Sequence, residues 1–286
     1  MSSSNSSPTP SSGPQSLAFD RAAPLYDATR GYPPDVAEQI GAAIIEAANA
    51  QPATRFLEVG VGTGRIALPI ALRGYDYTGV DISEPMLDRL RAKAAELQPA
   101  APDAAAPPLR LHLIMADMTA LPFPDASFDV VVAVHVFHLV HPWRQAVAEV
   151  LRVLRPGGAF LHCWDESLDS DAHAMQERWM QIVRELGSEV SIVGAERRSM
   201  VTDYVRQRGL TVEMLRTAIW QVQERSPRDA FEYIAQRIWS RTWLVPDEVF
   251  TASIQRLENW AINHYGPAYT MPRPQHLQFI ISRARW

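Results

Sequence analysis

The sequence predicts an α/β fold in which a mainly parallel sheet carries helices on both faces. Short apolar runs alternate with amphipathic helical patterns from residue 56 to residue 164. One of these runs, Phe128–Val136, is almost entirely β-branched or aliphatic, as expected of a central parallel strand that is buried on both faces. A turn with three alternating glycines, residues 60–64, joins the first apolar run to the first helix after it. These observations indicate an open sheet with a ligand site at the glycine turn.

The first strand and its turn lie in residues 55–67, RFLEVGVGTGRIA. The apolar side chains of Phe56, Leu57 and Val59 suit a buried strand. Gly60, Gly62 and Gly64 remove every Cβ at a sharp turn, so that a ligand can lie against the backbone N–H groups. A strand, a glycine-rich turn and a helix in this order are typical of a cradle for a nucleotide-type cofactor.

Two details distinguish this turn from a dinucleotide-binding one. Gly62 and Gly64 are two positions apart, where the dinucleotide fingerprint has three. Glu58 precedes the first glycine, and its carboxylate would repel a pyrophosphate but suits a ligand with an ammonium group. The segment resembles the Glu-x-Gly-x-Gly-x-Gly motif of the class I S-adenosylmethionine-dependent methyltransferases. That resemblance implies that the turn, with Val61, holds the methionine part of S-adenosylmethionine. It also implies a Rossmann-like, seven-stranded sheet with an antiparallel last strand.

The second strand, Tyr75–Val80, ends in Asp81, which lies 21 residues after Gly60. This is the spacing at which an acidic residue reaches the ribose diol in strand-helix-strand cofactor sites, and the resemblance adds Ile82 to the cofactor side. The other interpretation is that Asp81 is a turn or capping acid before the helix that starts at Glu84.

The third strand, Leu109–Met115, leads into Asp117 and Met118. The resemblance implies that Asp117 hydrogen-bonds the adenine amino group and that Met118 lines the ring, although an aspartate at a strand end is most often a turn former. Before this strand, the Ala/Pro-rich residues 98–108 predict an irregular surface insertion.

The fourth strand is followed by a helix that starts at Pro142 and by the corner Leu154–Gly158, before the fifth strand, Ala159–Trp164. The family has the same Leu-x-Pro-Gly-Gly corner. The predicted cofactor core therefore covers about residues 52–165, and the resemblance as a whole covers residues 19–286. The group resembled includes the quinone C-methyltransferases.

The remaining residues of the single methyltransferase domain, 17–286, predict two closing strands and a cap. The closing strands are Val212–Trp220 and His276–Ala284, within about residues 211–222 and 276–284. The cap is expected from two segments, 17–50 and 225–270. The first has a helix after Pro33, and the second has a helix capped by Ser226 and another that runs from Pro246 to Gly266. Residues 1–16, rich in Ser and Pro, are expected to be disordered.

The aromatic side chains of the second cap segment have two interpretations. They form a lid over an apolar or aromatic small molecule, or they only pack the cap helices on the sheet. They are Trp239, Trp243, Phe250, Trp260, Tyr265 and Tyr269. In the first cap segment, Tyr26 and Arg30 lie in a Tyr-Asp-x-x-Arg-x-Tyr stretch. It is similar to one that closes across the cofactor in related methyltransferases. Arg30 is expected to pair with the cofactor carboxylate, or to be an ordinary surface arginine.

Methyl transfer from a sulfonium needs alignment more than acid–base chemistry, so a general base matters only when the acceptor is protonated. By resemblance, His135 lies beside the cofactor, and His138 is our candidate for a base on the substrate side. Either histidine can also be a polar wall residue without a proton-transfer role. The His135-x-x-His138-x-x-His141 spacing suits neither one helix face nor a strand, so no metal is expected.

Composition narrows the classes of function. The 286 residues are 47% hydrophobic, and the single cysteine, Cys163, excludes a disulfide framework. Neither a bilayer-spanning stretch nor a secretory signal is recognisable, which favours the cytosol without a membrane. A net charge of −5 with 27 Lys and Arg argues against a nucleic-acid partner.

We therefore expect transfer of a methyl group from S-adenosylmethionine to a small molecule. The Asn/Asp-Pro-Pro-Tyr/Phe motif, typical of methyltransferases acting on nitrogens of proteins and nucleic acids, is absent from the end of the fourth strand. O-, N- and C-methylation and the oligomeric state stay open. The alternatives are an NAD-type oxidoreductase on a related fold and a non-catalytic homologue that still binds the cofactor.

Overall fold

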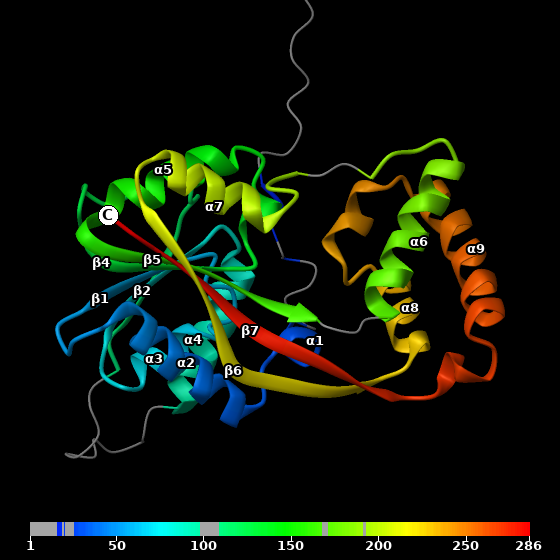
Figure 1. Ribbon diagram of the computed structural model, residues 1–286, viewed down its shortest axis with the longest axis horizontal. Coiled ribbons are helices and arrows are strands. Elements are labelled where there is room, and N and C mark those ends of the chain that lie inside the picture. Colours follow the sequence, from blue (N-terminus) through cyan, green and yellow to red (C-terminus); the bar gives the residue numbers. More distant parts are fainter. Residues whose placement is uncertain (1–15, 19, 21–25, 98–108, 168–170, 191–192) are drawn as a thin grey trace, which may run out of the picture.

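A seven-stranded sheet forms the centre of the molecule (Figure 1). The computed structural model describes residues 16–18, 20, 26–97, 109–167, 171–190 and 193–286. The strands follow the spatial order β3-β2-β1-β4-β5-β7-β6. Their bounds are β1 Arg55–Val59, β2 Asp76–Asp81, β3 Leu111–Met115, β4 Phe128–Val134, β5 Leu154–Ser167, β6 Thr211–Arg225 and β7 Arg273–Arg285. The expected disordered tail, apart from Ser16, and the expected insertion 98–108 lie outside the described residues.

The first five strands are parallel and the last one reverses direction. β1 pairs in parallel with β2 and β4, and β4 pairs in parallel with β5. β7 lies between β5 and β6 and is antiparallel to both. The prediction of a mostly parallel, seven-stranded sheet with an antiparallel last strand is confirmed.

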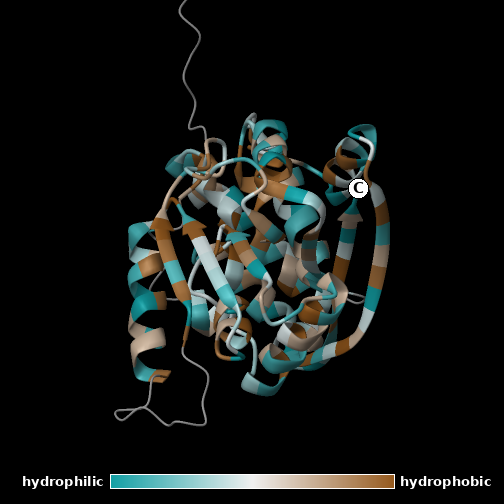
Figure 2. Ribbon diagram, turned by 90° about the vertical axis from the view of Figure 1, so that its left-hand side faces the viewer, coloured by the Kyte–Doolittle hydropathy of each residue, from teal (hydrophilic) through white to brown (hydrophobic). Residues whose placement is uncertain are grey.

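Helices cover both faces of this sheet. On one face α2 (Pro34–Ala48), α3 (Ala67–Ala71) and α4 (Glu84–Leu97) pack on the strands, and on the other face lie α5 (Trp143–Val153) and α7 (Arg198–Gln207). Figure 2 shows strands enclosed between helices whose turns alternate between hydrophobic and hydrophilic, as expected of amphipathic helices around a buried sheet.

A separate group of helices forms a cap at one end of the sheet (Figure 1, right). It contains α6 (Asp171–Glu185), α8 (Pro227–Ala235) and α9 (Asp247–Tyr265), with the short 3₁₀ helices η3 (Ser240–Leu244) and η4 (Gly266–Thr270). The cap has its own hydrophobic core, built from buried residues of α6, α8 and α9. The far ends of β6 and β7 stay paired as they run to it, from Trp220 opposite Gln278 to Arg225 opposite Arg273.

The start of α8 and the end of α9, the two predicted cap helices, each have a local cause. The Ser226 hydroxyl accepts a hydrogen bond from the Asp229 N–H at 3.2 Å, and the Ser226 N–H donates to the Asp229 carboxylate at 2.6 Å, so that α8 begins with a capping box. Gly266, with φ of 52°, ends α9. The start of α8 and the end of α9 were therefore predictable from the sequence.

The cap differs from expectation in two elements. The helix predicted from residues 17–50, α2, belongs to the sheet layer, because Val36, Ile40 and Ile44 share a hydrophobic core with Phe56 of β1. The cap instead includes α6, which the sequence analysis did not assign. The spacing of its buried Met175, Trp179, Ile182 and Val183 is helical and was the available signal.

Most of the predicted lid aromatics pack inside the cap. Phe250, Trp260, Tyr265 and Tyr269 all belong to or pack on its hydrophobic core. Trp243 instead donates a hydrogen bond from its indole N–H to the Arg237 carbonyl oxygen at 2.6 Å. No helix in the described part of the chain has the length and apolar composition that a membrane span requires.

Candidate active site

The glycine turn after β1 is held against the end of β2. The N–H groups of Gly60 and Val61 both donate to the Val80 carbonyl oxygen, at 2.9 and 3.0 Å. Gly60, with φ of 74°, adopts a left-handed conformation, and a Cβ there would lie 2.6 Å from a methyl group of Val136. Glycine is therefore required at this point, and it lines the first cavity with its backbone alone.

Asp81 lies at the end of β2 and faces the same turn. Its carboxylate accepts hydrogen bonds from the Gly62 N–H at 2.8 Å and from the Ser83 N–H at 3.0 Å. Burial raises the pKa of Asp81, and the hydrogen bonds from backbone N–H groups oppose this rise. Asp81 is thus a turn acid, which was one of its two predicted roles, and its carboxylate also lines a cavity.

The first cavity lies along the carboxyl ends of β1, β2, β3 and β4. Asp117 stands on its wall, with its carboxylate accepting from the Thr119 N–H at 2.8 Å. Nine residues that the sequence analysis assigned to the cofactor line this cavity: Gly60, Gly62, Asp81, Ile82, Asp117, Met118, His135, Tyr26 and Arg30. Residues from five separate segments of the chain therefore meet at one place.

Three of the assigned residues do not line the cavity. Gly64 is needed for packing, because a Cβ there would lie 2.1 Å from the Leu90 side chain of α4. Val61 is buried against Gly79 of β2. For these two positions the packing of helix and strand explains the residue.

Glu58 is the third residue that does not line the cavity. It is 2% exposed, and its carboxylate accepts a hydrogen bond from the Tyr77 hydroxyl at 2.9 Å. Burial raises the pKa of Glu58 to about 8, because it penalises the charged form. Glu58 therefore lies behind the turn, within electrostatic reach of Arg65 and Asp81 but without a surface on the cavity.

The helix α1 (Tyr26–Arg30) closes one side of the cavity. The Asp27 carboxylate accepts hydrogen bonds from the Thr63 hydroxyl at 2.5 Å and from the Lys93 ammonium at 3.0 Å, which fixes α1 to the glycine turn and to α4. Arg30 donates to the Tyr233 hydroxyl at 2.6 Å and to the Ile238 carbonyl oxygen at 3.3 Å. Arg30 thus joins α1 to the cap.

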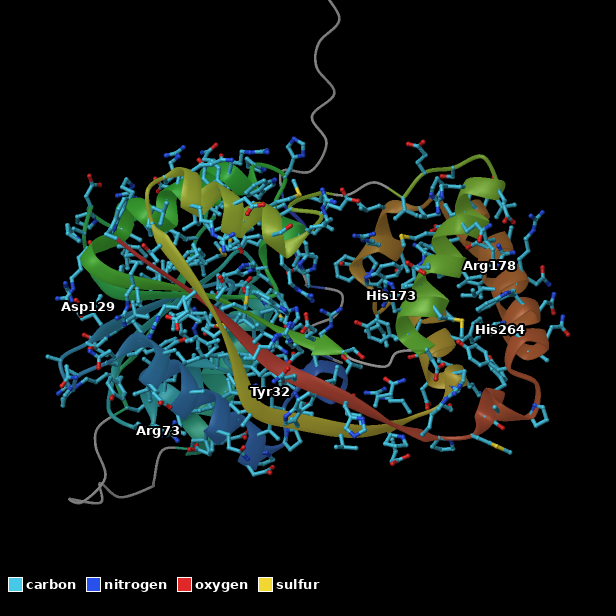
Figure 3. The ribbon with its side chains drawn as sticks, in the orientation of Figure 1. Tyr32, Arg73, Asp129, His173, Arg178 and His264 are labelled. Atoms are coloured by element: carbon cyan, nitrogen blue, oxygen red, sulfur yellow. The ribbon has the colours of Figure 1, made fainter. Side chains whose placement is uncertain are left out.

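A buried polar network next to the cavity was missed by the sequence analysis. The Arg65 guanidinium lies over the Tyr32 ring, 4.8 Å from its centroid, and the Tyr32 hydroxyl donates to the Asp165 carboxylate at 2.9 Å. Figure 3 shows Tyr32 beside β7, where it makes an edge-to-face contact with Phe279. The sequence signal for this network was the position of Arg65, a charged residue directly after Gly64 of the glycine turn.

His135 follows β4 and is held by β5. Its φ is 51°, an uncommon value for a residue with a side chain. The Asp165 N–H donates to His135 Nε2 at 2.9 Å, and the Asp165 carboxylate lies 3.2 Å from the same nitrogen. Burial lowers the pKa of His135, so the ring is neutral at pH 7 and Nε2 accepts from the backbone.

A second, larger cavity of about 710 Å³ lies between the sheet and the cap. Its wall includes His135 and His138 after β4, Trp164 of β5, and residues of α6 such as His173, which Figure 3 shows on the side of α6 toward the sheet. Of the predicted lid aromatics, Trp239 lines it. The two cavities share Arg30, His135 and Val136 and therefore meet at the end of β4.

His138 belongs to the short 3₁₀ helix η2 (Phe137–Leu139) on the wall of the second cavity. Burial, and then the nearby charges of His135, Arg30, Arg241 and Arg198, lower the pKa of His138 to about 3. The imidazole is thus neutral at physiological pH and a weak base in this environment. His141 is exposed and lines neither cavity, and the described residues contain no group of three side chains placed to hold a metal ion.

Comparisons with known proteins give the following similarities. A family model described as a methyltransferase domain matches residues 57–162. An uncharacterized methyltransferase of Mycobacterium tuberculosis is 29% identical over 250 residues, which cover 87% of each chain. The demethylmenaquinone methyltransferase of Renibacterium salmoninarum is 33% identical over 145 residues, 49% of this chain and 54% of that protein. The crystal structure of the YcgJ protein of Bacillus subtilis superposes with a TM-score of 0.55 at 19% identity, covering 87% of this chain and 99% of that one, and shows the same fold.

Proposed function

Since the chain is a class I S-adenosylmethionine-dependent methyltransferase whose residues 57–162 match the methyltransferase family model, we propose that it methylates a small organic acceptor bound in the second cavity. The observation that carries this proposal is the junction of the two cavities at Arg30, His135 and Val136. A cofactor in the first cavity and an acceptor in the second would meet at that junction, as transfer between them requires.

The residues of the first cavity fit S-adenosylmethionine. Asp81 offers its carboxylate to the two ribose hydroxyls, and Asp117 offers its carboxylate to the adenine amino group. We assign the methionine part to the turn at Gly60 and Gly62, because both glycines line the first cavity with backbone atoms alone. When bound, the cofactor supplies a methyl group on a sulfonium, which is already a good leaving group.

The protein's own residues supply alignment and exclude water. The Asp165 N–H holds the His135 ring at the junction of the cavities, and the Tyr32 hydroxyl holds the Asp165 carboxylate. Arg30 ties α1 to the cap and so keeps both cavities closed on that side. These contacts position groups and need no proton transfer.

We place His138 on the acceptor side as the group that takes a proton when the acceptor loses one. Its neutral ring can accept a hydrogen bond from the acceptor at pH 7. Its pKa of about 3 makes it a weak base until a bound acceptor changes the local charge. The alternative is that His138 only lines the cavity and transfers no proton. The effect of His138→Ala on turnover, compared with its effect on cofactor affinity, distinguishes the two roles.

The experiment that tests this function uses S-adenosylmethionine labelled in its methyl group. The purified protein is incubated with metabolite pools, and mass spectrometry identifies any small molecule that gains the label. A labelled product that depends on the protein and is lost in Asp81→Ala supports the proposal. Cofactor binding with no labelled product in any pool would favour the non-catalytic alternative, and binding of NAD in place of S-adenosylhomocysteine would favour an oxidoreductase.

A further inference from the structure

The second cavity is rich in arginine, contrary to the expectation of an apolar lid. We propose that the acceptor carries an anionic oxygen group, a carboxylate or a phosphate, which binds between Arg198 and Arg241 in this cavity. The inference rests on the proposed function and narrows the class of its substrate. Arg198 is the first residue of α7, and Arg241 lies in η3 of the cap, so the anion would be held from both sides of the cavity.

The charges on the cavity wall favour an anion. Four arginines line it, namely Arg30, Arg197, Arg198 and Arg241, against two glutamates, Glu166 and Glu196. The Glu166 carboxylate is already paired with Arg216 at 2.6 Å. The cavity therefore holds an excess of positive charge in the described part of the chain, although the whole protein is net negative at −5.

Arg198 and Arg241 are held in place by contacts other than ion pairs, and carboxylates act on them only from a longer distance, Glu166 and Asp165 on Arg198 and Glu196 on Arg241. Arg198 donates to the Asp165 carbonyl oxygen at 3.4 Å and lies over the Trp164 ring, 5.3 Å from its centroid. Arg241 contacts the Met180 sulfur at 3.2 Å and lies over the Trp239 ring, 5.5 Å from its centroid. Within the described ranges, neither forms an ion pair with a carboxylate at 4.0 Å or less.

Burial lowers the pKa of Arg198 and of Arg241, because each cation has lost part of its hydration. A partly buried guanidinium without a carboxylate partner gains most from an anionic oxygen, to which it can donate two parallel hydrogen bonds. The geometry of the two side chains is already fixed by the indole rings, so little ordering is needed when an anion binds.

Two further polar groups on the same wall have no partner in the described structure. The indole N–H of Trp164 and the Nδ1 of His162 are buried without a hydrogen bond, in side chains that are 5% and 6% exposed. Both residues line the second cavity. The Trp164 N–H can only donate, so it requires an acceptor atom such as an anionic oxygen. This unpaired donor is a second feature of the same wall, beside the arginine charges, that suits an anionic oxygen.

An anion at this place also bears on His138. Part of the lowering of its pKa comes from the charges of Arg241 and Arg198. A bound carboxylate or phosphate would compensate those charges and raise the pKa of the imidazole. The acceptor would then make its own proton acceptor more basic, which is the change of local charge that the proposed role of His138 requires.

The test is the binding of simple probes to the protein saturated with S-adenosylhomocysteine, followed by tryptophan fluorescence and by calorimetry. The probes are benzoate, phenyl phosphate and benzamide, which is a neutral analogue of benzoate. We expect saturable binding of benzoate, of phenyl phosphate or of both, and much weaker binding of benzamide. Tighter binding of benzoate would identify the anionic group of the acceptor as a carboxylate, and tighter binding of phenyl phosphate would identify it as a phosphate.

Variants locate the site. Arg198→Gln and Arg241→Gln are each expected to weaken binding of the anionic probe by roughly tenfold or more, the size of a lost charge-assisted hydrogen bond. Arg206→Gln is the matched control, because Arg206 also lies on α7 but is exposed and paired with Asp203 at 3.2 Å. It should leave probe binding unchanged. Each variant is first shown to bind S-adenosylhomocysteine, which separates a folding defect from loss of the anion site.

Benzamide binding as tightly as benzoate would overturn the inference, as would anion binding that survives both substitutions. An absence of probe binding up to the solubility limit, in protein that binds S-adenosylhomocysteine, would also overturn it while leaving the methyltransferase assignment intact. Failure of S-adenosylhomocysteine itself to bind would instead contradict the proposed function. The two failures are therefore distinguishable.

Discussion

The Asp81 carboxylate accepts a hydrogen bond from the Gly62 N–H at 2.8 Å. This contact joins the end of β2 to the glycine turn after β1, which are neighbouring parallel strands. The acid that faces the first cavity therefore also fixes the shape of the turn that closes it. A change at Asp81 is expected to act on both.

Replacement of Asp81 by alanine should weaken binding of S-adenosylhomocysteine by roughly 1.5–3 kcal/mol, the size of a lost hydrogen bond to a charged group. Calorimetry measures the affinity. Asp76→Ala is the matched control, because Asp76 begins the same strand at its other end and lines neither cavity. Equal affinity of Asp81→Ala and wild type would remove the ribose assignment.

Gly60→Ala should lose both stability and cofactor affinity. Alanine at a φ of 74° costs about 1–2 kcal/mol in backbone strain, and its Cβ would lie 2.6 Å from Val136. Gly157→Ala is the control, because its φ is 77° but no atom lies within 4 Å of the added Cβ. Denaturant unfolding should show a larger loss for Gly60→Ala. An equal loss of unfolding free energy in the two variants would mean that Val136 moves away from the added Cβ without destabilising the protein.

Glu58→Gln should change how stability depends on pH. Because the pKa of Glu58 is about 8 in the folded protein and about 4.5 as a free side chain, the folded state binds the proton more tightly. Its contribution to stability is intact below about pH 4.5 and falls as pH rises to about 8 and beyond, by on the order of 5 kcal/mol at most. Glutamine does not titrate, so the variant should gain stability relative to wild type between pH 5 and pH 8.5.

Urea unfolding of Glu58→Gln and wild type at pH 5 and at pH 8.5 measures this gain in stability. Glu38→Gln serves as the control, since Glu38 is an exposed residue of α2 paired with Arg73 at 2.8 Å. A stability difference between Glu58→Gln and wild type that is the same at pH 5 and pH 8.5 would show that the Glu58 carboxyl does not carry a raised pKa.

His138→Ala should reduce turnover more than it reduces affinity for S-adenosylhomocysteine, because His138 lines only the second cavity. Single-turnover rates with the identified acceptor, compared with calorimetry, measure the two effects. His141→Ala is the control, as an exposed histidine on the same segment. Turnover equal to wild type would leave His138 as a wall residue.

Much of the fold could be predicted from the sequence, because it is determined by residues that are close together in the chain. The apolar strands, the glycine turn and the helix N-cap at Ser226 depend on residues close together in the chain, and the structure has the N-cap as predicted and each strand near its predicted place. One difference is that β5 begins at Leu154, within the predicted corner Leu154–Gly158. The acids Asp81 and Asp117 were also found from local spacing, since each directly follows a strand of a parallel sheet.

The remaining features depend on contacts between distant segments. Arg65, Tyr32 and Asp165 come from three segments, and no spacing in the sequence shows that they meet. The same holds for Arg198 and Arg241, which are brought to one cavity only by the docking of the cap. The aromatic residues of the cap suggested an apolar lid because composition cannot distinguish a side chain in the cap core from one on a cavity wall.

The most direct test of the account is a calorimetric titration of wild-type protein with S-adenosylhomocysteine, with NAD as the comparison. We predict saturable binding of S-adenosylhomocysteine at a single site and no heat with NAD. Neither heat nor a shift in melting temperature at millimolar S-adenosylhomocysteine would contradict the assignment of the first cavity to the cofactor.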